Sequence, residues 1–199
     1  MASLIRCTVI LNTIIYMRLK EKYKKEIMPK MKEKFSYGND MEVPKITKVV
    51  LNIGFGRHTK EKAYVAKVIE VLTKISGQKP ILTKARLSIS SFKIREGMTI
   101  GACVTLRQNR MYDFIEKLVN VTYPRVRDFR GLNDKSVDNT GNLTLGIKEY
   151  PAFPEINIED ADEVFGLEVS FATTAKTKEE GVELFRLFGF PFKKQDKKN

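Results

Sequence analysis

The chain of 199 residues is 42% hydrophobic, which is enough apolar sequence to bury a core, and we expect one domain over residues 17–192. It carries 36 Lys and Arg against 24 Asp and Glu, a net charge of +12. Two cysteines exclude a disulfide framework, and the single His58 has no cysteine or acid at ligand spacing. We therefore expect a reducing compartment, no metal and no cofactor.

The charge is unevenly distributed along the chain. Residues 17–141 hold 27 basic and 13 acidic side chains, whereas residues 142–192 hold 4 basic and 10 acidic ones. The basic part favours an anionic partner, and nucleic acid is the commonest such partner for a chain with a pI near 9.6. A solvated basic surface that only maintains solubility is the alternative that charge alone leaves open.

The two ends of the chain differ from the rest. Residues 1–16 are expected to be an extension or a misassigned start, with Met17 as the functional start. The apolar run within them is too short to span a bilayer, so no membrane partner is expected. Residues 193–199 are expected to form a basic, disordered tail.

Hydrophobic periodicity predicts the elements in chain order. Helices are expected at Leu19–Phe35, at about Thr59–Ser76, around Met111–Val119, and after the capping box of Thr177 and Glu180. Strands are expected at Lys45–Ile53, just before the 84–95 loop, and at Ile100–Leu106, Leu143–Ile147 and Leu167–Phe171. This order predicts an α+β fold: a mainly antiparallel sheet with helices packed on one face, the other face free for RNA, and a projecting basic loop.

The same periodicity predicts which faces are buried. The helix near Thr59 is expected to bury Val65, Ile69, Leu72 and Ile75. In the first strand, simple alternation places Ile46 and Asn52 on the face opposite to Leu51.

The 84–95 loop combines cations and hydroxyl groups. Its basic residues, against the single carboxylate of Glu96, are Lys84, Arg86, Lys93 and Arg95, with Ser88, Ser90 and Ser91 between them. Cations and hydroxyls on a projecting loop suit a polyanion.

A glycine-bearing turn, Asn52-Ile-Gly-Phe-Gly, follows the first strand and raises the possibility of a nucleotide-binding enzyme. The third glycine of a dinucleotide fingerprint is absent, and no Gly-Lys-Ser/Thr follows for a phosphate loop. Glu61 is the only acid nearby, so we expect no catalytic residues. The glycines are assigned to the backbone turn.

The face of the sheet that is not apolar offers hydrogen-bonding groups, with Glu168 as the one carboxylate among them. These groups are Asn52, Thr105, Arg107, Thr144, Lys148 and Ser170. Such a face beside a basic loop is a usable RNA platform, because irregular RNA presents 2′-hydroxyls and splayed bases. An ordinary solvated sheet face remains the alternative.

Ordered sequence blocks over residues 17–193 resemble one protein family. The blocks are Met17-Arg-Leu-Lys-Glu-Lys-Tyr, Val43-Pro-Lys, Asn52-Ile-Gly-Phe-Gly, Ser76-Gly-Gln-Lys-Pro, Thr83-Lys-Ala-Arg, Phe92-Lys-Ile-Arg-Glu-Gly, Val104-Thr-Leu-Arg, Pro124-Arg-Val-Arg-Asp-Phe-Arg-Gly-Leu, Leu145-Gly-Ile-Lys-Glu, Phe153-Pro-Glu-Ile and Thr173-Thr-Ala-Lys-Thr. Together they are similar to the bacterial-type large-subunit ribosomal protein five family, which binds 5S rRNA in the central protuberance.

The resemblance implies a cytoplasmic ribosomal protein without catalysis. Its implied partners are 5S rRNA, large-subunit rRNA, other 5S rRNA-binding ribosomal proteins, peptidyl-site tRNA and a basic small-subunit head protein. Carried onto matching positions, it implies Asn52, Gln78, Thr105 and Arg107 for rRNA, Lys84, Arg86 and Ser88 for tRNA, and Phe129, Arg130, Asn133 and Asp138 for the intersubunit bridge.

Two positions depart from the family pattern. Leu87 stands where a second basic residue is usual, and Thr140 stands where the bridge loop has an arginine. One phosphate contact fewer is expected to lower the salt dependence of tRNA binding by about one unit of slope. A protein-only interaction module that uses the acidic C-terminal third is a further alternative.

Overall fold

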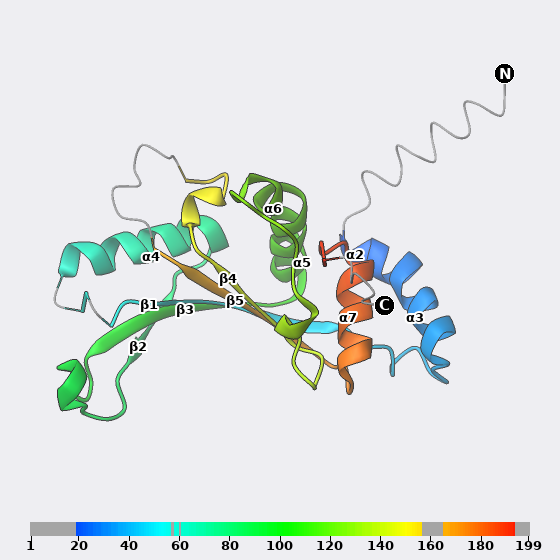
Figure 1. Cartoon of the computed structure of the whole chain (residues 1–199), viewed down its shortest axis with the longest axis horizontal. Helices are drawn as coiled ribbons and strands as arrows, with labels where there is room; N and C mark the ends of the chain where they lie inside the picture. Colours follow the sequence, from blue (N-terminus) through cyan, green and yellow to red (C-terminus); the bar gives the residue numbers. More distant parts are fainter. Residues whose placement is uncertain (1–18, 57, 60, 157–164, 194–199) are drawn as a thin grey trace, which may run out of the picture.

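The computed structural model describes residues 19–56, 58–59, 61–156 and 165–193, so residues 1–16 and most of the predicted C-terminal tail lie outside the described residues. Five strands form one antiparallel sheet in the order β2-β3-β1-β5-β4 (Figure 1). They are β1 (Ile46–Gly54), β2 (Ile81–Lys84), β3 (Thr99–Leu106), β4 (Leu143–Ile147) and β5 (Leu167–Thr173).

Two of the described helices each run from one α-helical segment to the next through a π-helical turn. The first runs through α2 (Leu19–Lys22), a π-helical turn (Tyr23–Ile27) and α3 (Met28–Phe35). The third runs through α5 (Gln108–Lys117), a second π-helical turn (Leu118–Thr122) and α6 (Tyr123–Arg125). The others are α4 (Lys62–Ser76), α7 (Lys178–Leu187) and the 3-10 turns Ser90–Phe92, Asp134–Ser136 and Tyr150–Ala152. Within the described ranges no helix is long and apolar enough to cross a membrane.

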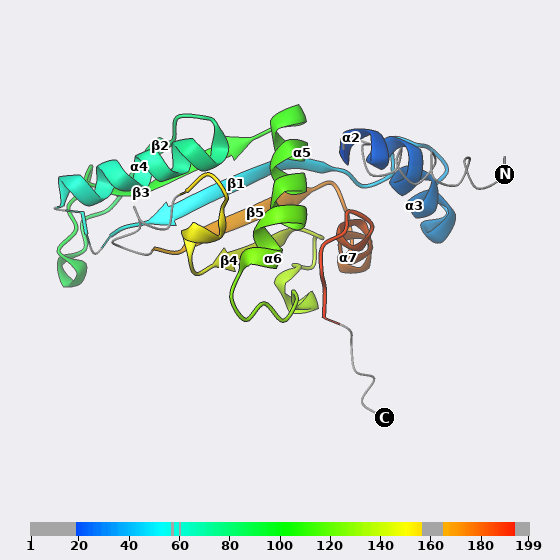
Figure 2. The ribbon, with the colours of Figure 1, turned by 90° about the horizontal axis from the view of Figure 1, so that it is seen from above.

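Helices α4 and α5 lie over one face of the sheet, and no described helix lies over the other (Figures 1 and 2). Successive side chains of a strand point to opposite sides of the sheet, so every second strand residue lies on the face that the helices cover. Its buried strand residues are Val49, Leu51, Ile53, Ala102, Val104, Leu106, Leu143, Leu145, Ile147, Leu167, Val169 and Phe171. The predicted α+β architecture with one free face is confirmed.

The N-terminal helix and α7 pack together beyond one end of the sheet (Figure 2). The rings of Tyr23 and Phe188 stack with centroids 5.8 Å apart, and Lys34 pairs with Glu183 at 2.7 Å. The predicted capping box of Thr177 and Glu180 is present at the start of α7. It satisfies two backbone N–H groups that a helix start would leave without partners.

Two predicted faces are wrong in detail. The buried residues of α4 are Val68, Val71, Leu72 and Ile75, whereas Val65 and Ile69 are only half-buried. The helix begins at Lys62, three residues after the predicted start, because Thr59 belongs to a turn in which its hydroxyl donates to the Gly56 carbonyl at 2.8 Å. Ile46 is buried with the core, because an irregularity in pairing between Ile46 and Lys48 breaks the simple alternation.

Candidate RNA interface

The helix-free face of the sheet, called here the open face, presents two rows of side chains across the strands. Strand pairing aligns one row as Thr144, Ser170, Val50 and Thr105, and the next as Gly146, Glu168, Asn52, Cys103 and Ile81. Asn52 and Thr105 therefore lie on the same face of neighbouring strands, as alternation predicts. Most side chains in the two rows are small or can hydrogen-bond, and Ile81, 73% exposed, adds an apolar group at the β2 edge.

The carboxylate of Glu168 has a partner on this face. The Asn52 side-chain amide donates from Nδ2 to Glu168 Oε2 at 3.1 Å. This bond fixes the amide so that its carbonyl oxygen is left to accept from a hydroxyl donor. The hydroxyl groups of Thr144 and Ser170 are 3.5 Å apart, and either can be the donor.

Arg107 and Gln78 lie at one end of the open face. Arg107 is exposed, directly follows β3 and precedes α5. Gln78 precedes β2, and the register that pairs Ile81 with Cys103 brings it level with the end of β3. The Gln78 N–H donates to the Ser76 hydroxyl at 3.2 Å, and that hydroxyl donates in turn to the Leu72 carbonyl at 2.6 Å. The four residues expected to bind rRNA thus lie on β1, on β3 and its end, and just before β2.

The segment between β2 and β3, residues 85–98, is called here the finger. It extends the hairpin beyond the sheet (Figure 1), with Ala85 N–H donating to the Met98 carbonyl at 2.8 Å. Ile89 and Ile94 exchange two backbone hydrogen bonds of 2.9 and 3.1 Å nearer the tip. The finger is therefore an ordered hairpin rather than a loose loop, and the predicted projecting basic loop is confirmed.

The side chains expected to contact tRNA differ in what they can offer. Lys84 and Arg86 are exposed, whereas the Ser88 hydroxyl accepts from the Glu96 N–H at 2.9 Å across the finger. The finger also exposes apolar side chains that sequence reasoning missed: Leu87 is 75% exposed, Phe92 70% and Ile89 44%. The signal for them was the placement of apolar residues among cations in a segment without helical or strand periodicity.

The predicted bridge residues lie between α6 and β4, and three of them, Phe129, Asn133 and Asp138, have structural partners. Phe129 is half-buried and stacks on Tyr123 with ring centroids 4.8 Å apart, so it supports the loop rather than presenting its ring. Asn133 accepts from the Lys135 N–H at 3.2 Å and caps a 3-10 turn. Arg130 is exposed.

Asp138 organises the second half of this loop. Its carboxylate accepts from the Thr140 N–H at 3.0 Å, the Asn142 N–H at 2.7 Å and the Asn142 side-chain amide at 3.1 Å. Burial raises the pKa of Asp138, but these hydrogen bonds from Asn142 and Thr140 outweigh it, so the pKa lies below its ordinary value. Asn142 in turn accepts from the Thr173 N–H of β5 at 2.9 Å, which ties the loop to the sheet.

Metal chemistry has no visible basis in this part of the molecule. Among the described residues, no group of three or more His, Cys, Asp and Glu side chains comes together as ligands for an ion. Hydrogen-bond donors, acceptors and cations are the groups that the open face and the finger offer.

These features describe a basic α+β domain with an open polar sheet face and an ordered projecting hairpin. Residues 39–95 match the family model described as ribosomal protein L5, and residues 99–192 match the model of the C-terminus of the same ribosomal family. The chain belongs to the ribosomal protein L5 family. The family resemblance predicted from the sequence blocks is confirmed.

Similar proteins are each named large ribosomal subunit protein uL5. The relative from Desulforapulum autotrophicum is 55% identical over 175 residues, which cover 88% of this chain and 98% of the relative. That from Lactobacillus johnsonii is 55% identical over 176 residues (88% and 98%), and that from Clostridium acetobutylicum is 53% identical over 175 residues (88% and 97%). Membership in a family of structural ribosomal proteins confirms the expectation of a protein that is not an enzyme.

Proposed function

We propose that residues 17–192 act as one RNA-binding domain of the cytoplasmic large ribosomal subunit. The domain binds 5S rRNA through the open face and helps to attach it, beside large-subunit rRNA and other 5S rRNA-binding proteins, in the central protuberance. The finger contacts peptidyl-site tRNA. The loop between α6 and β4 bridges to a basic protein of the small-subunit head.

The observation that carries the 5S rRNA assignment is the open face itself. It lacks a covering helix among the described residues, and it offers hydrogen-bonding groups from neighbouring strands: Asn52 on β1 and Thr105 on β3, with Arg107 at the end of β3. Such groups suit 2′-hydroxyls and unstacked bases, while Arg107 suits a phosphate. The carboxylate of Glu168 accepts from the Asn52 amide at 3.1 Å, which holds the Asn52 side chain in place on this face.

The finger supports a separate contact with a second RNA. Lys84 and Arg86 are exposed on a hairpin that extends past the sheet, so they can reach a molecule that does not lie on the open face. Ser88 contributes by holding the hairpin through Glu96, and we assign it a positioning role in the tRNA contact.

The bridge assignment rests on charge and on an anchored loop. Residues 142–192 hold 10 acidic and 4 basic side chains, which favours a basic protein partner. Arg130, Asn133 and Asp138 lie in the neighbouring loop, and Asp138 holds that loop in one conformation. A pre-ordered loop loses less conformational entropy when a partner binds it.

The test is binding of the full chain to 5S rRNA against an equimolar tRNA competitor, across a salt series. Arg107→Ala is expected to weaken 5S binding by about tenfold or more and Asn52→Ala by about fivefold, from the net worth of a charged and a neutral hydrogen bond. Lys30→Ala and Asn39→Ala, which remove exposed groups at the far end of the molecule, are the matched controls. Binding that is indifferent to RNA identity and to both open-face substitutions would overturn the proposal.

A further inference from the structure

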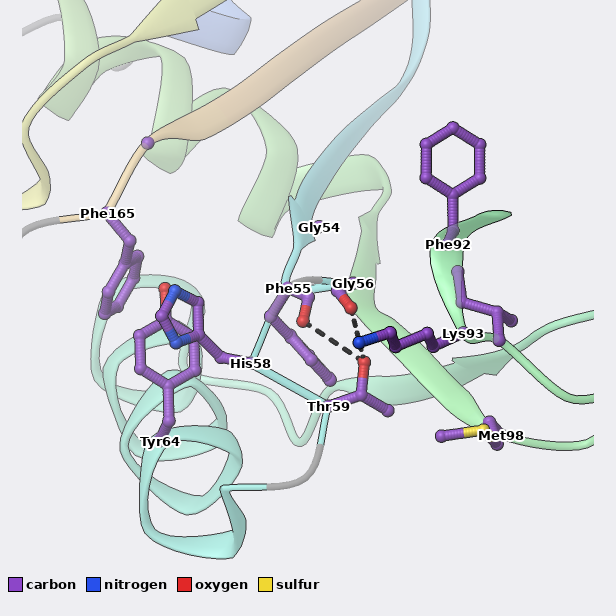
Figure 3. A pocket seen from close by; sticks show the side chains of 12 residues that line it. Gly54, Phe55, Gly56, His58, Thr59, Tyr64, Phe92, Lys93, Met98 and Phe165 are labelled. Carbon is purple, nitrogen blue, oxygen red and sulfur yellow. Dashed lines mark hydrogen bonds between the residues drawn. The ribbon is translucent and has the colours of Figure 1, made fainter. Parts of the chain in front are cut away.

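A cavity of about 850 Å³ lies between the turn that follows β1 and the finger (Figure 3). Its volume falls within the range of about 300–1,000 Å³ that is typical of small-ligand sites. One wall comes from His58, Tyr64 and Phe165, and the facing wall comes from Phe92, Lys93 and Met98 of the finger. Sequence positions more than 100 residues apart therefore converge on one hollow.

The first wall is an aromatic platform with fixed geometry. The rings of His58 and Tyr64 stack with centroids 4.7 Å apart and an interplanar angle of 23°. Phe55 and Phe165, both buried, approach Tyr64 edge-on at 6.5 and 6.0 Å. The His58 ring is exposed above this support. A preformed stack of this kind is what unpaired bases use when they bind proteins.

Gly54 and Gly56 line the cavity between the two walls, and the chain itself does not require glycine at either position. Neither has a positive φ, and a Cβ atom at either would meet nothing within 4 Å. By contrast, a Cβ at Gly101 would lie 2.7 Å from Thr83 Oγ1. Gly56 lies in the turn after β1, as predicted, but packing and a positive φ do not require glycine at either position. The missing side chains leave open surface over which another backbone can approach closely.

The polar groups at the cavity suit an anion. Lys93 is exposed, and its side chain extends from the finger toward Gly56 and Thr59 (Figure 3). No carboxylate is among the described residues that line the cavity. The nearest acid named in the turn, Glu61, pairs with His58 Nδ1 at 3.3 Å. Among the described residues that line the cavity, a phosphate at its mouth would thus meet the cation of Lys93 and no carboxylate.

The cavity is continuous with the open face. Gly54 and Gly166 line both this cavity and a shallow hollow on the open face that also includes Asn52 and Lys148. An RNA strand that lies on the open face can reach the cavity without leaving the protein surface.

We propose that this cavity receives one unpaired nucleotide of the RNA that lies on the open face. The base stacks on the exposed ring of His58, which Tyr64 supports. The sugar and phosphate pass over Gly54 and Gly56, and Lys93 neutralises the phosphate. The inference rests on the proposed 5S rRNA binding and adds to it a site that holds a single splayed base.

The test is chemical probing of 5S rRNA, nucleotide by nucleotide, in its complex with the full chain. His58→Ala removes the stacking ring, Gly56→Val fills the surface over which the backbone passes, and Lys93→Ala removes the cation. Each is expected to expose the same one nucleotide to the reagent and to weaken 5S binding by about tenfold. Gly38→Val, at a glycine whose Cβ would meet nothing closer than 3.9 Å, is the control that leaves the pattern unchanged.

Outcomes separate this inference from the proposed function. If Asn52→Ala and Arg107→Ala weaken 5S binding while the cavity variants change no nucleotide, the cavity proposal is overturned and the open face stands. If the open-face variants bind 5S rRNA as tightly as the wild type does, the proposed function is overturned, and the cavity proposal that rests on it is overturned with it. Saturable binding of adenosine monophosphate as tight as that of 5S rRNA would overturn the RNA assignment in favour of a free-nucleotide site. Lys93 is exposed, so its variant reports on the cavity even if Gly56→Val unfolds the chain.

Discussion

Gly181→Ala tests how the predicted bridge loop is held. A Cβ atom on Gly181 of α7 would lie 2.5 Å from the Cα and 2.7 Å from the carbonyl oxygen of Gly141. Because the neighbouring atoms belong to the backbone, α7 and the loop must move apart to make room for the Cβ. Overpacking typically costs roughly 1–3 kcal/mol, and we expect a cost near the upper end of that range. Replacing a mid-helix glycine by alanine returns about 1 kcal/mol of helix propensity. We expect a net loss of about 1–2 kcal/mol in the free energy of unfolding.

The assay is urea and thermal unfolding of the two variants Gly181→Ala and Gly146→Ala beside the wild type. For a chain of this size the loss lowers the Tm by about 2–8 °C, at roughly 2–4 °C per kcal/mol. Gly146 lies in β4, where a Cβ meets nothing within 4 Å, so its alanine variant is expected to match or exceed wild-type stability by up to about 1 kcal/mol. A Gly181→Ala variant as stable as Gly146→Ala would refute the close contact.

Three further predictions concern the loop, the finger and α7. The pKa of Asp138 is lower in the folded chain than the value of about 3.9 in the unfolded chain. Its carboxylate therefore stabilises the fold fully at pH values above about 3.9, and this stabilisation is lost as the pH falls through the pKa of the folded chain. The stability difference between wild type and Asp138→Ala should therefore narrow on acidification, as measured by urea unfolding over a pH series. The double variant Lys84→Ala, Arg86→Ala is expected to lower the salt slope of tRNA binding by up to about two while 5S binding is kept; an unchanged slope in filter binding would contradict it. Thr177→Ala removes the cap of α7 and should cost about 1 kcal/mol in thermal unfolding, whereas Lys178→Ala should not.

Elements with strong periodicity could be predicted from the sequence. In β1 and β3, alternation alone placed Asn52 and Thr105 on the same face, because the side-chain period of a strand fixes the face once the core residues are known. The capping box at Thr177 was equally local, since it depends on two side chains three residues apart.

Other features depend on contacts that sequence does not show. Ile46 is buried because pairing with β5 is irregular at that point, and the buried face of α4 is set by where the helix crosses the sheet. The cavity escaped prediction for the same reason, because His58 and Lys93 line one cavity only once β1 and β3 pair and bring the turn beside the finger. The resemblance indicated Ser88 for tRNA, but only the structure shows that its hydroxyl is used inside the finger.

The central claim is that 5S rRNA covers the open face, and Cys103 reports on it directly. This free thiol is half-buried on β3 beside Asn52 on that face, and burial raises its pKa, so alkylation is followed at mildly alkaline pH. With Cys7 replaced by serine, Cys103 is the remaining thiol of the chain. We expect saturating 5S rRNA to slow alkylation in proportion to the bound fraction, while an equal amount of tRNA leaves the rate unchanged. An alkylation rate that is the same with saturating 5S rRNA as without it would contradict the account.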